Sequence, residues 1–285
     1  MAGAGFATIK KRIKSINNTK KITNAMSLVA TSKLRKSKEK LYVNSQFKKG
    51  FDEVIESIIN GYEGNSIYFK GNGSKNKLYL TITSDLGLCG GYNVNVMLEL
   101  NNQAKGDREN TKVLSIGQKG RNLLKKYRYE TVAEYVEISA PPSSKDAKEI
   151  TNKMLQLYRS GEVGEVYIIY TNFVSTIRRN VGVKKLLPLE RSESSESNGI
   201  YIDTKNTDAE QMIKEIVPMY LQQVILNLLI TSKASEESTR MEAMNGATKS
   251  ANDLLDKLNL QYNRLRQSVI TQEISEIVGG AESQK

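Results

Sequence analysis

Side chains that often carry chemistry are scarce in this sequence. It contains no histidine, and its single cysteine is Cys89. One cysteine cannot form an intrachain disulfide, and a chain without histidine lacks the usual zinc ligands and the commonest acid–base catalyst. The sequence therefore predicts no metal site, no cofactor and no catalytic residue.

Long apolar runs are also missing. None approaches the roughly 20 residues needed to span a bilayer. The amino-terminal MAGAGFATIKKRIK has no apolar stretch after its basic residues, unlike a secretory signal peptide. We therefore expect the chain to stay in the cytoplasm, and its length allows one large domain or two small ones.

Acidic residues are nearly absent from the first 49 positions. This segment holds thirteen Lys or Arg residues and one acidic residue, Glu39, whereas the whole chain carries a net charge of +11. The rest of the chain is therefore close to neutral, and the basicity is local. A solvated helix face usually carries acidic residues that pair with its basic ones at i+4. Their near absence here predicts an acidic partner, although a plain solvated face stays an alternative.

The amino-terminal region, from Ile9 to about Asn60, lacks proline and has the period of a helix. About 50 helical residues would extend about 75 Å, well beyond a small domain, so this helix must project or pair along its length. Glycines at 61, 64, 71 and 73 then end the pattern. The predicted stripe is Ile9, Ile13, Ile16, Thr19, Thr23, Met26, Ala30, Leu34, Ser37 and Leu41.

A second long helix is predicted at the carboxyl end. It starts near Asp208 or at Pro218 and continues to about Val278. Two long helices at opposite ends of one chain should pair antiparallel, with both termini at one tip and the longer carboxyl-terminal helix overhanging. Its predicted stripe is Tyr220, Val224, Leu228, Ser232, Ser235, Thr239, Ala243, Ala247, Ala251, Leu254, Leu258, Tyr262, Leu265 and Val269.

The segment between the helices alternates strand and helix patterns, which indicates a small α/β domain with a partly parallel sheet. Strands are expected at 77–83, 112–116 and 163–174, helices at 93–105, 118–127 and 144–160, and a polar surface loop at 190–199. The predicted fold is thus α/β plus a long antiparallel α-helical coiled coil formed by the N- and C-terminal helices. The expected boundaries are 1–74 and 208–285 for the helices and 75–207 for the α/β domain.

Three separated segments then carry a family resemblance: IKSINNTKKITNAMSLVATSKLRKS (13–37), ITSDLGLCGGYN (82–93) and ITQEISEIVGGAES (270–283). With these three segments in this order, the chain resembles the ATP synthase γ family. The third segment matches the family signature at Ile270, Thr271, Glu273, Glu276, Gly280, Ala281 and Ser283. One departure is Leu86, where the family usually has arginine. A chloroplast-type insertion with paired cysteines is absent.

The resemblance implies a non-catalytic rotor, the central stalk of an F-type ATP synthase. Three α and three β subunits would surround the shaft, and the ε subunit and the c ring would contact its foot. Ion flow through the c ring would turn the shaft and drive the catalytic β subunits through ATP synthesis, or the reverse. The protein would lie at the cytoplasmic face of the cell membrane as a peripheral protein, without binding nucleic acid functionally.

The same resemblance implies roles for particular residues, all of them contacts with partner subunits. A basic group would face an acidic loop of β, and Met26 would lie near that contact, although a coiled-coil seam position explains Met26 equally well. A pair before the signature would hydrogen-bond a catch loop of the ring, and the signature itself would form an apolar bearing. The residues are Met26, Lys33, Arg35, Lys36, Arg266, Gln267, Ile270, Thr271 and Glu273.

Two other functions fit parts of the sequence. Gly87, Gly90 and Gly91 lie between a predicted strand and helix, where phosphates can bind, but neither a G-x-G-x-x-G nor a G-K-[ST] spacing is present. The basic segment would also attract nucleic acid at low salt. That segment lacks interleaved aromatic residues and any helix-turn-helix or zinc pattern, so specific binding is not expected.

The nucleotide alternative is directly testable. Because a tight turn explains the three glycines, we expect isothermal titration of the purified chain with ATP to detect no micromolar binding. Saturable micromolar binding would restore the enzyme hypothesis.

Overall fold

A computed structural model of the chain describes residues 2–62, 64–176, 178–190 and 209–282. The chain forms two compact units, one made of residues 1–30 and 241–285 and the other of residues 31–240. Two helices contribute to both units: α1 (Ala2–Gly61) and α6 (Ala209–Glu282). Both predicted long helices are confirmed. Of the two expected starts for the second helix, the earlier is right, and Pro218 lies inside α6.

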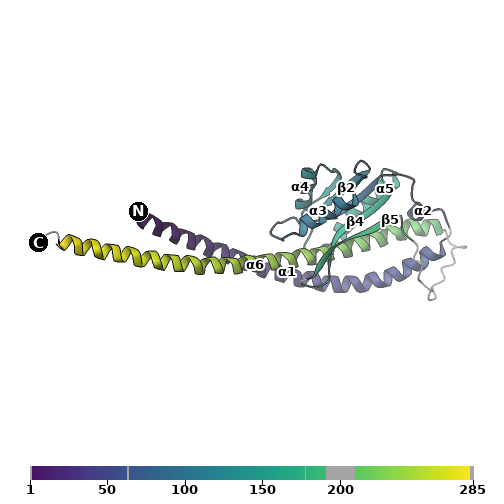
Figure 1. Cartoon of the computed structure of the whole chain (residues 1–285). Coiled ribbons are helices and arrows are strands. Elements are labelled where there is room, and N and C mark those ends of the chain that lie inside the picture. The colour runs from purple at the N-terminus through teal and green to yellow at the C-terminus, as the bar shows by residue number, and fades with distance from the viewer. Residues whose placement is uncertain (1, 63, 177, 191–208, 283–285) are drawn as a thin grey trace. The chain divides into compact units, whose positions relative to one another are not determined.

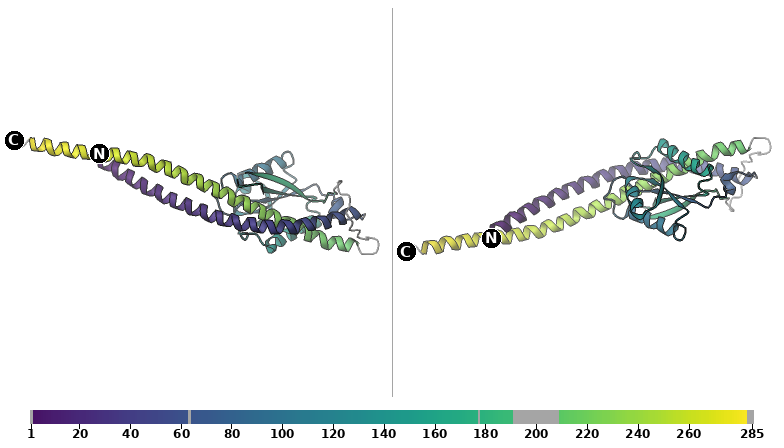
Figure 2. Two further views of the ribbon diagram at one scale, coloured as in Figure 1. Left: turned by 90° about the horizontal axis from the view of Figure 1, so that it is seen from below. Right: turned by 90° about the horizontal axis from the view of Figure 1, so that it is seen from above.

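In the unit formed by residues 1–30 and 241–285, α1 and α6 lie side by side and run in opposite directions (Figure 2). Phe6 stacks on Tyr262 with ring centroids 4.7 Å apart, and the hydroxyls of Thr23 and Thr248 are 2.7 Å apart. Residue numbers rise along α1 as they fall along α6, so the helices are antiparallel. The start of α1 lies beside α6, whose carboxyl-terminal end continues past it (Figure 2).

The seam of this coiled coil differs from the predicted stripe at several positions. Thr19 is exposed and Ser27 is buried, while Leu254 is 47% exposed and Leu255 only 7%. The buried positions follow alternating steps of three and four, an average of about 3.5 residues, which is the repeat of a coiled coil. At these places the predicted stripes took a step of three where the seam takes a step of four, so they left the seam by one residue.

The unit of residues 31–240 contains a five-stranded sheet in the order β3-β2-β1-β4-β5. Neighbouring strands are parallel except for β4 and β5, which are antiparallel, so the predicted partly parallel sheet is confirmed. The strands are β1 (Lys77–Ile82), β2 (Thr111–Ile116), β3 (Glu130–Tyr135), β4 (Glu165–Phe173) and β5 (Arg179–Leu187).

Helices cover both faces of this sheet (Figure 1). Tyr79, Val113 and Ile169 pack with α3 and α4 on one face. Leu80 and Ile168 belong to a larger core on the other face, with α5 and parts of α1 and α6. Adjacent strand residues thus point to opposite layers, as a pleated sheet requires. The helices are α2 (Ile67–Lys70), α3 (Tyr92–Gln103), α4 (Gln118–Tyr127) and α5 (Ser144–Arg159).

Three elements of this unit were not predicted: α2, β3 and β5. Both missed strands are sheet edges, and their side chains are mostly half-buried, which weakens the apolar pattern. The β5 sequence also includes Gly182 and two lysines, Lys184 and Lys185. The expected loop at 190–199 lies, apart from Glu190, outside the described residues.

One stretch of α6 passes a length and composition test for a membrane span, with mean hydropathy 1.3. Half of that stretch is buried inside the protein. Leu221, Val224, Ile225 and Leu229 are buried in the core on the α5 side of the sheet. The core of this unit therefore accounts for the apolar character of α6.

Gly246 offers a test of the helix assignment. It lies on the exposed side of α6, and a methyl group added there would have no atom within 4 Å. Because glycine costs about 0.5–1 kcal/mol relative to alanine in a helix, Gly246→Ala should stabilise the chain by about that amount in urea denaturation followed by circular dichroism.

A contrasting variant is Gly164→Ala. A side chain there would overlap the backbone carbonyl of Ser74, so this change should destabilise the chain. Destabilisation by Gly246→Ala would show that residue 246 is not in a regular exposed helix.

Candidate functional site

The basic group expected on α1 lies on its surface in the unit of residues 31–240. Arg35 and Lys36 are exposed, and Lys33 is half-buried. Arg35 Nε lies 3.0 Å from Glu39 Oε1, and both side chains are largely exposed. An exposed i,i+4 pair of this kind contributes little stability. The three cations therefore remain accessible to an acidic surface.

Met26 is half-buried in the unit of residues 1–30 and 241–285. Ile22 and Val29, one turn before and one turn after it, are 60% and 55% exposed. Together the three make an apolar strip on the outside of α1. Sequence reasoning missed Ile22 and Val29, although both are apolar residues outside the predicted stripe.

The pair Arg266 and Gln267 is exposed on α6. Thr271 and Glu273 are exposed too, and the Thr271 hydroxyl donates to the Gln267 carbonyl at 2.9 Å. This hydrogen bond stays within the helix. All four side chains are therefore presented outward rather than used for packing.

The end of α6 carries an apolar face without cover from the described residues. Every residue from Ile270 to Ala281 is exposed. Ile270, Ile274, Ile277 and Val278 are 47–72% exposed and follow i, i+4, i+7, i+8 spacing, which places them on one side of the helix. The predicted overhang is confirmed for this unit, and its exposed apolar face is of the kind that marks an interaction site.

The central motif forms the loop from β1 to α3. Asn93 holds this loop closed: its Oδ1 accepts from the Ser84 backbone N–H at 2.9 Å, and its Nδ2 donates to Ser84 Oγ at 2.8 Å and to Cys89 Sγ at 3.3 Å. Asp85 Oδ1 accepts from the backbone N–H groups of Gln118 and Glu137, each at 3.0 Å. The polar residues of the motif are thus structural.

Leu86, the departure from the family pattern, is 64% exposed in this loop. Its carbonyl accepts from Ser84 Oγ at 2.7 Å and from Arg240 Nη2 at 3.0 Å. The side chain at position 86 therefore faces outward while the backbone is anchored, so an arginine there would also present its charge outward.

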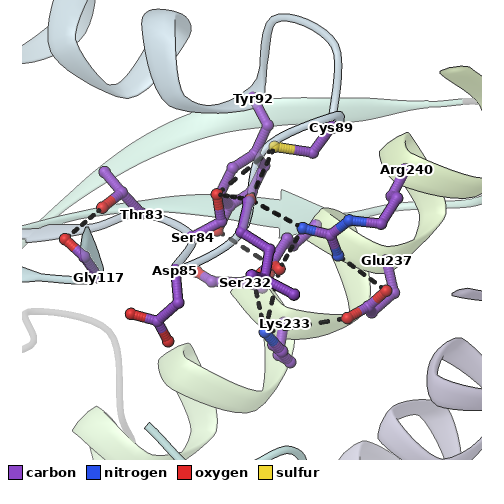
Figure 3. Close-up of polar contacts among 12 residues, drawn as sticks. Thr83, Ser84, Asp85, Cys89, Tyr92, Gly117, Ser232, Lys233, Glu237 and Arg240 are labelled. Carbon is purple, nitrogen blue, oxygen red and sulfur yellow. Dashed lines mark hydrogen bonds and ion pairs between the residues drawn. The ribbon is translucent and has the colours of Figure 1, made fainter. Parts of the chain in front are cut away.

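A buried ionic cluster lies on the α6 segment that faces this loop (Figure 3). Arg240 lies 2.8 Å from a Glu236 oxygen and 2.9 Å from a Glu237 oxygen, and Lys233 Nζ lies 2.8 Å from Glu236. Glu236, Glu237 and Arg240 are 1–5% exposed. Although burial lowers the pKa of the Arg240 guanidinium, the two carboxylates raise it overall, so the arginine stays charged.

Similarity to known proteins covers the whole chain. A family model described as ATP synthase matches residues 6–283. An ATP synthase gamma chain of Clostridium novyi is 51% identical over all of both chains. The chain belongs to the ATP synthase γ family. A second ATP synthase gamma chain, from Clostridium acetobutylicum, is 49% identical over the full length of both.

Solved structures share the fold of this γ chain. A chain of the Euglena gracilis mitochondrial ATP synthase, described as OSCP/F1/c-ring, aligns with a TM-score of 0.76 at 15% identity, covering 99% of this chain and 95% of that one. A chain of the rotor of the same enzyme aligns with a TM-score of 0.73. A central stalk/c-ring structure from Tetrahymena thermophila gives 0.61 at 24% identity, over 79% of this chain and 99% of that one.

The ionic cluster predicts unequal costs for two arginine deletions. Arg240→Ala leaves Glu236 and Glu237 buried with only Lys233 as a cationic partner, so it should destabilise the chain by about 3–5 kcal/mol. Arg35→Ala removes an exposed pair and should cost less than about 1 kcal/mol. Urea denaturation of the two variants measures the difference, and equal stabilities would contradict the burial of Arg240.

Proposed function

We propose that this γ chain is the rotating central stalk of an F-type ATP synthase. It couples transmembrane ion flow through the c ring to the conformational cycle of the catalytic β subunits, for ATP synthesis or for ATP-driven ion pumping. The full-length 51% identity to an ATP synthase gamma chain carries the proposal. An exposed apolar helix end on a coiled coil gives it physical support.

The chain performs no chemistry in this proposal. Three α and three β subunits surround the coiled coil, and the β subunits bind, close on and release nucleotide. The rotor acts by making different contacts with three identical neighbours, so it biases the conformational equilibrium of each one differently. A rotor surface can shift such an equilibrium only by interacting unequally with the two conformations.

The basic part of α1 faces the β subunits. Lys33, Arg35 and Lys36 present positive charge to an acidic loop of β, and Arg35 and Lys36 do so from exposed positions. Attraction between charges varies slowly with distance, unlike packed apolar contact. Such a surface holds its partner while allowing it to move past. Met26 adds an apolar contact beside it.

The end of α6 turns inside the ring of α and β subunits. Ile270 and the apolar residues beyond it form the bearing, because apolar contact lacks the directional bonds that would resist rotation. Arg266 and Gln267 hydrogen-bond a catch loop of the ring, and Thr271 and Glu273 complete the polar side of this surface.

The α/β domain, residues 75–207, is the foot, between helix segments 1–74 and 208–285. It contacts the ε subunit and the c ring, so the chain is a peripheral protein at the cytoplasmic face of the cell membrane. No functional contact with nucleic acid and no cofactor belong to this role. Most of the basic side chains between residues 10 and 49 are exposed and would meet acidic protein surfaces instead.

The bearing is testable in a reconstituted complex. Deletion of residues 270–285, or Ile274→Ser with Ile277→Ser and Val278→Ser, should lower ion-driven ATP synthesis several-fold, because the apolar contact with the ring is lost. Leu260→Ser is the matched control, since Leu260 is 62% exposed on the same helix but precedes the bearing. Full synthesis by the deletion variant would refute the bearing role.

A further inference from the structure

The strand order of the α/β domain contains a switch point. From β1 the chain proceeds outward through β2 to β3, and then returns to place β4 on the other side of β1. In open α/β sheets, ligands bind in the crevice beyond the carboxyl ends of the strands where the order reverses. Here that crevice lies beyond the carboxyl ends of β1 and β4.

The chain itself fills this crevice. Ser232 Oγ accepts from the Thr171 backbone N–H at 3.3 Å, and Ser235 Oγ donates to the Thr171 carbonyl at 3.0 Å. The Tyr92 hydroxyl, at the start of α3, donates to the Ser232 carbonyl at 3.2 Å. Two cavities border the helix here. One of about 20 Å³ lies beyond the ends of β1 and β2, and one of about 260 Å³ is lined by Tyr92, Thr171 and Thr239. Both are smaller than small-molecule pockets, which measure roughly 300–1,000 Å³.

A second side of the same helix segment holds the loop after β1. Arg240 donates to the carbonyls of Leu86 and Gly87, at 3.0 and 3.3 Å. At 100° per residue, Arg240 lies about 140° around the helix axis from Ser235. The domain therefore contacts α6 on two sides, β4 through hydrogen bonds to Thr171 and the loop through the Arg240 guanidinium.

We infer that residues 232–240 of α6 act as a built-in ligand of the switch-point crevice and form a rotational clamp between the α/β domain and the shaft helix, with Arg240 as its positioning residue. The inference rests on the proposed rotor function. Torque applied to the α/β domain passes to α6 without slip, because the clamp allows α6 only one rotation and one axial position relative to the domain.

Apolar packing alone would only weakly determine the rotation and axial position of α6. Leu221, Ile225, Leu228 and Leu229 have similar shapes one turn apart, so a shifted helix could repack them. The hydrogen bonds of the clamp, in contrast, have no equivalent one helical turn away. A shift of one turn would replace Arg240 by Met244 or by the carboxylate of Glu236, neither of which can donate to the loop carbonyls.

Burial of the four charged side chains costs desolvation free energy. The network is therefore better explained by the position that it fixes for α6 than by added stability. Replacing a buried ion network by apolar residues of similar size is often neutral or stabilising, whereas removing one partner is not. The buried network has the form of a specificity device, as polar residues do when they fix the register of coiled coils. The decisive variant must therefore remove the whole network together.

The experiment uses the complete complex in vesicles, with ATP hydrolysis and ion pumping measured together. Lys233→Met, Glu236→Leu, Glu237→Met and Arg240→Met are combined in one clamp variant. We expect the isolated chain to melt at the wild-type temperature or above, hydrolysis to continue, and ions pumped per ATP to fall about threefold or more. Unchanged pumping per ATP would overturn the clamp.

A matched control removes an ion pair at the opposite end of β1. Lys77 Nζ lies 2.8 Å from Asp107 Oδ2, and Lys77→Met with Asp107→Leu should leave pumping per ATP unchanged.

If the clamp variant fails to fold, Arg240→Lys tests the inference in its place. Lysine keeps the charge but cannot bond both loop carbonyls as the planar guanidinium does. Arg240→Lys should lower pumping per ATP, and wild-type pumping would overturn the inference.

A cross-link provides a rescue that a merely structural role would not show. A side chain built on Gly90 would lie 3.3 Å from Thr239 Cγ2, so cysteines at these positions are near enough to join. The φ of +53° at Gly90 strains a cysteine there, so the reduced form of the same variant is the reference. In the clamp variant with Cys89→Ala, Gly90→Cys and Thr239→Cys, diamide oxidation should restore pumping per ATP and reduction should abolish it again.

Failure to restore coupling with the bond formed would refute slip as the cause. Failure of the rotor proposal would look different, because a complex assembled without this chain would still couple hydrolysis to pumping.

Discussion

A helix that is buried on all sides must satisfy every polar group that it carries, and α6 meets this constraint from Thr231 to Arg240. Eight of these ten residues are buried, although most have polar or charged side chains. The hydrogen-bond partners come from two places. The end of β4 bonds the two serines spaced three apart, and the closed loop after β1 accepts from Arg240. Without Arg240, the carbonyls of Leu86 and Gly87 would lose the guanidinium that bonds them to the helix.

Most of the fold could be predicted because it rests on repeating patterns. The long helices are evident from apolar spacing over many turns, and β1, β2 and β4 from short apolar runs in a buried sheet. The edge strands β3 and β5 were missed because half-buried side chains, Gly182 and two lysines dilute the alternation. The coiled-coil seam was placed with local errors because adjacent leucines such as Leu254 and Leu255 offer two apolar choices that only the partner helix resolves.

The family motifs single out residues that the structure leaves mostly exposed, and their contacts with partner subunits stay a prediction. The clamp was not predictable in the same way. Lys, Glu and Arg are usually solvated, so the run SKASEESTR indicates a weakened seam rather than a buried network. Its burial depends on Thr171, Leu86 and Gly87, which are more than 60 residues away in the sequence. The local spacing of residues in this run carries no information about such distant partners.

The uncovered face of Ile270, Ile274, Ile277 and Val278 has a consequence for the cell. Isolated chains would present the same isoleucine-rich surface to one another, and exposed apolar patches of this kind promote aggregation. An excess of this subunit over its partners would therefore burden the chaperones and proteases that handle orphan proteins. Balanced synthesis of the subunits follows as a requirement of this helix end.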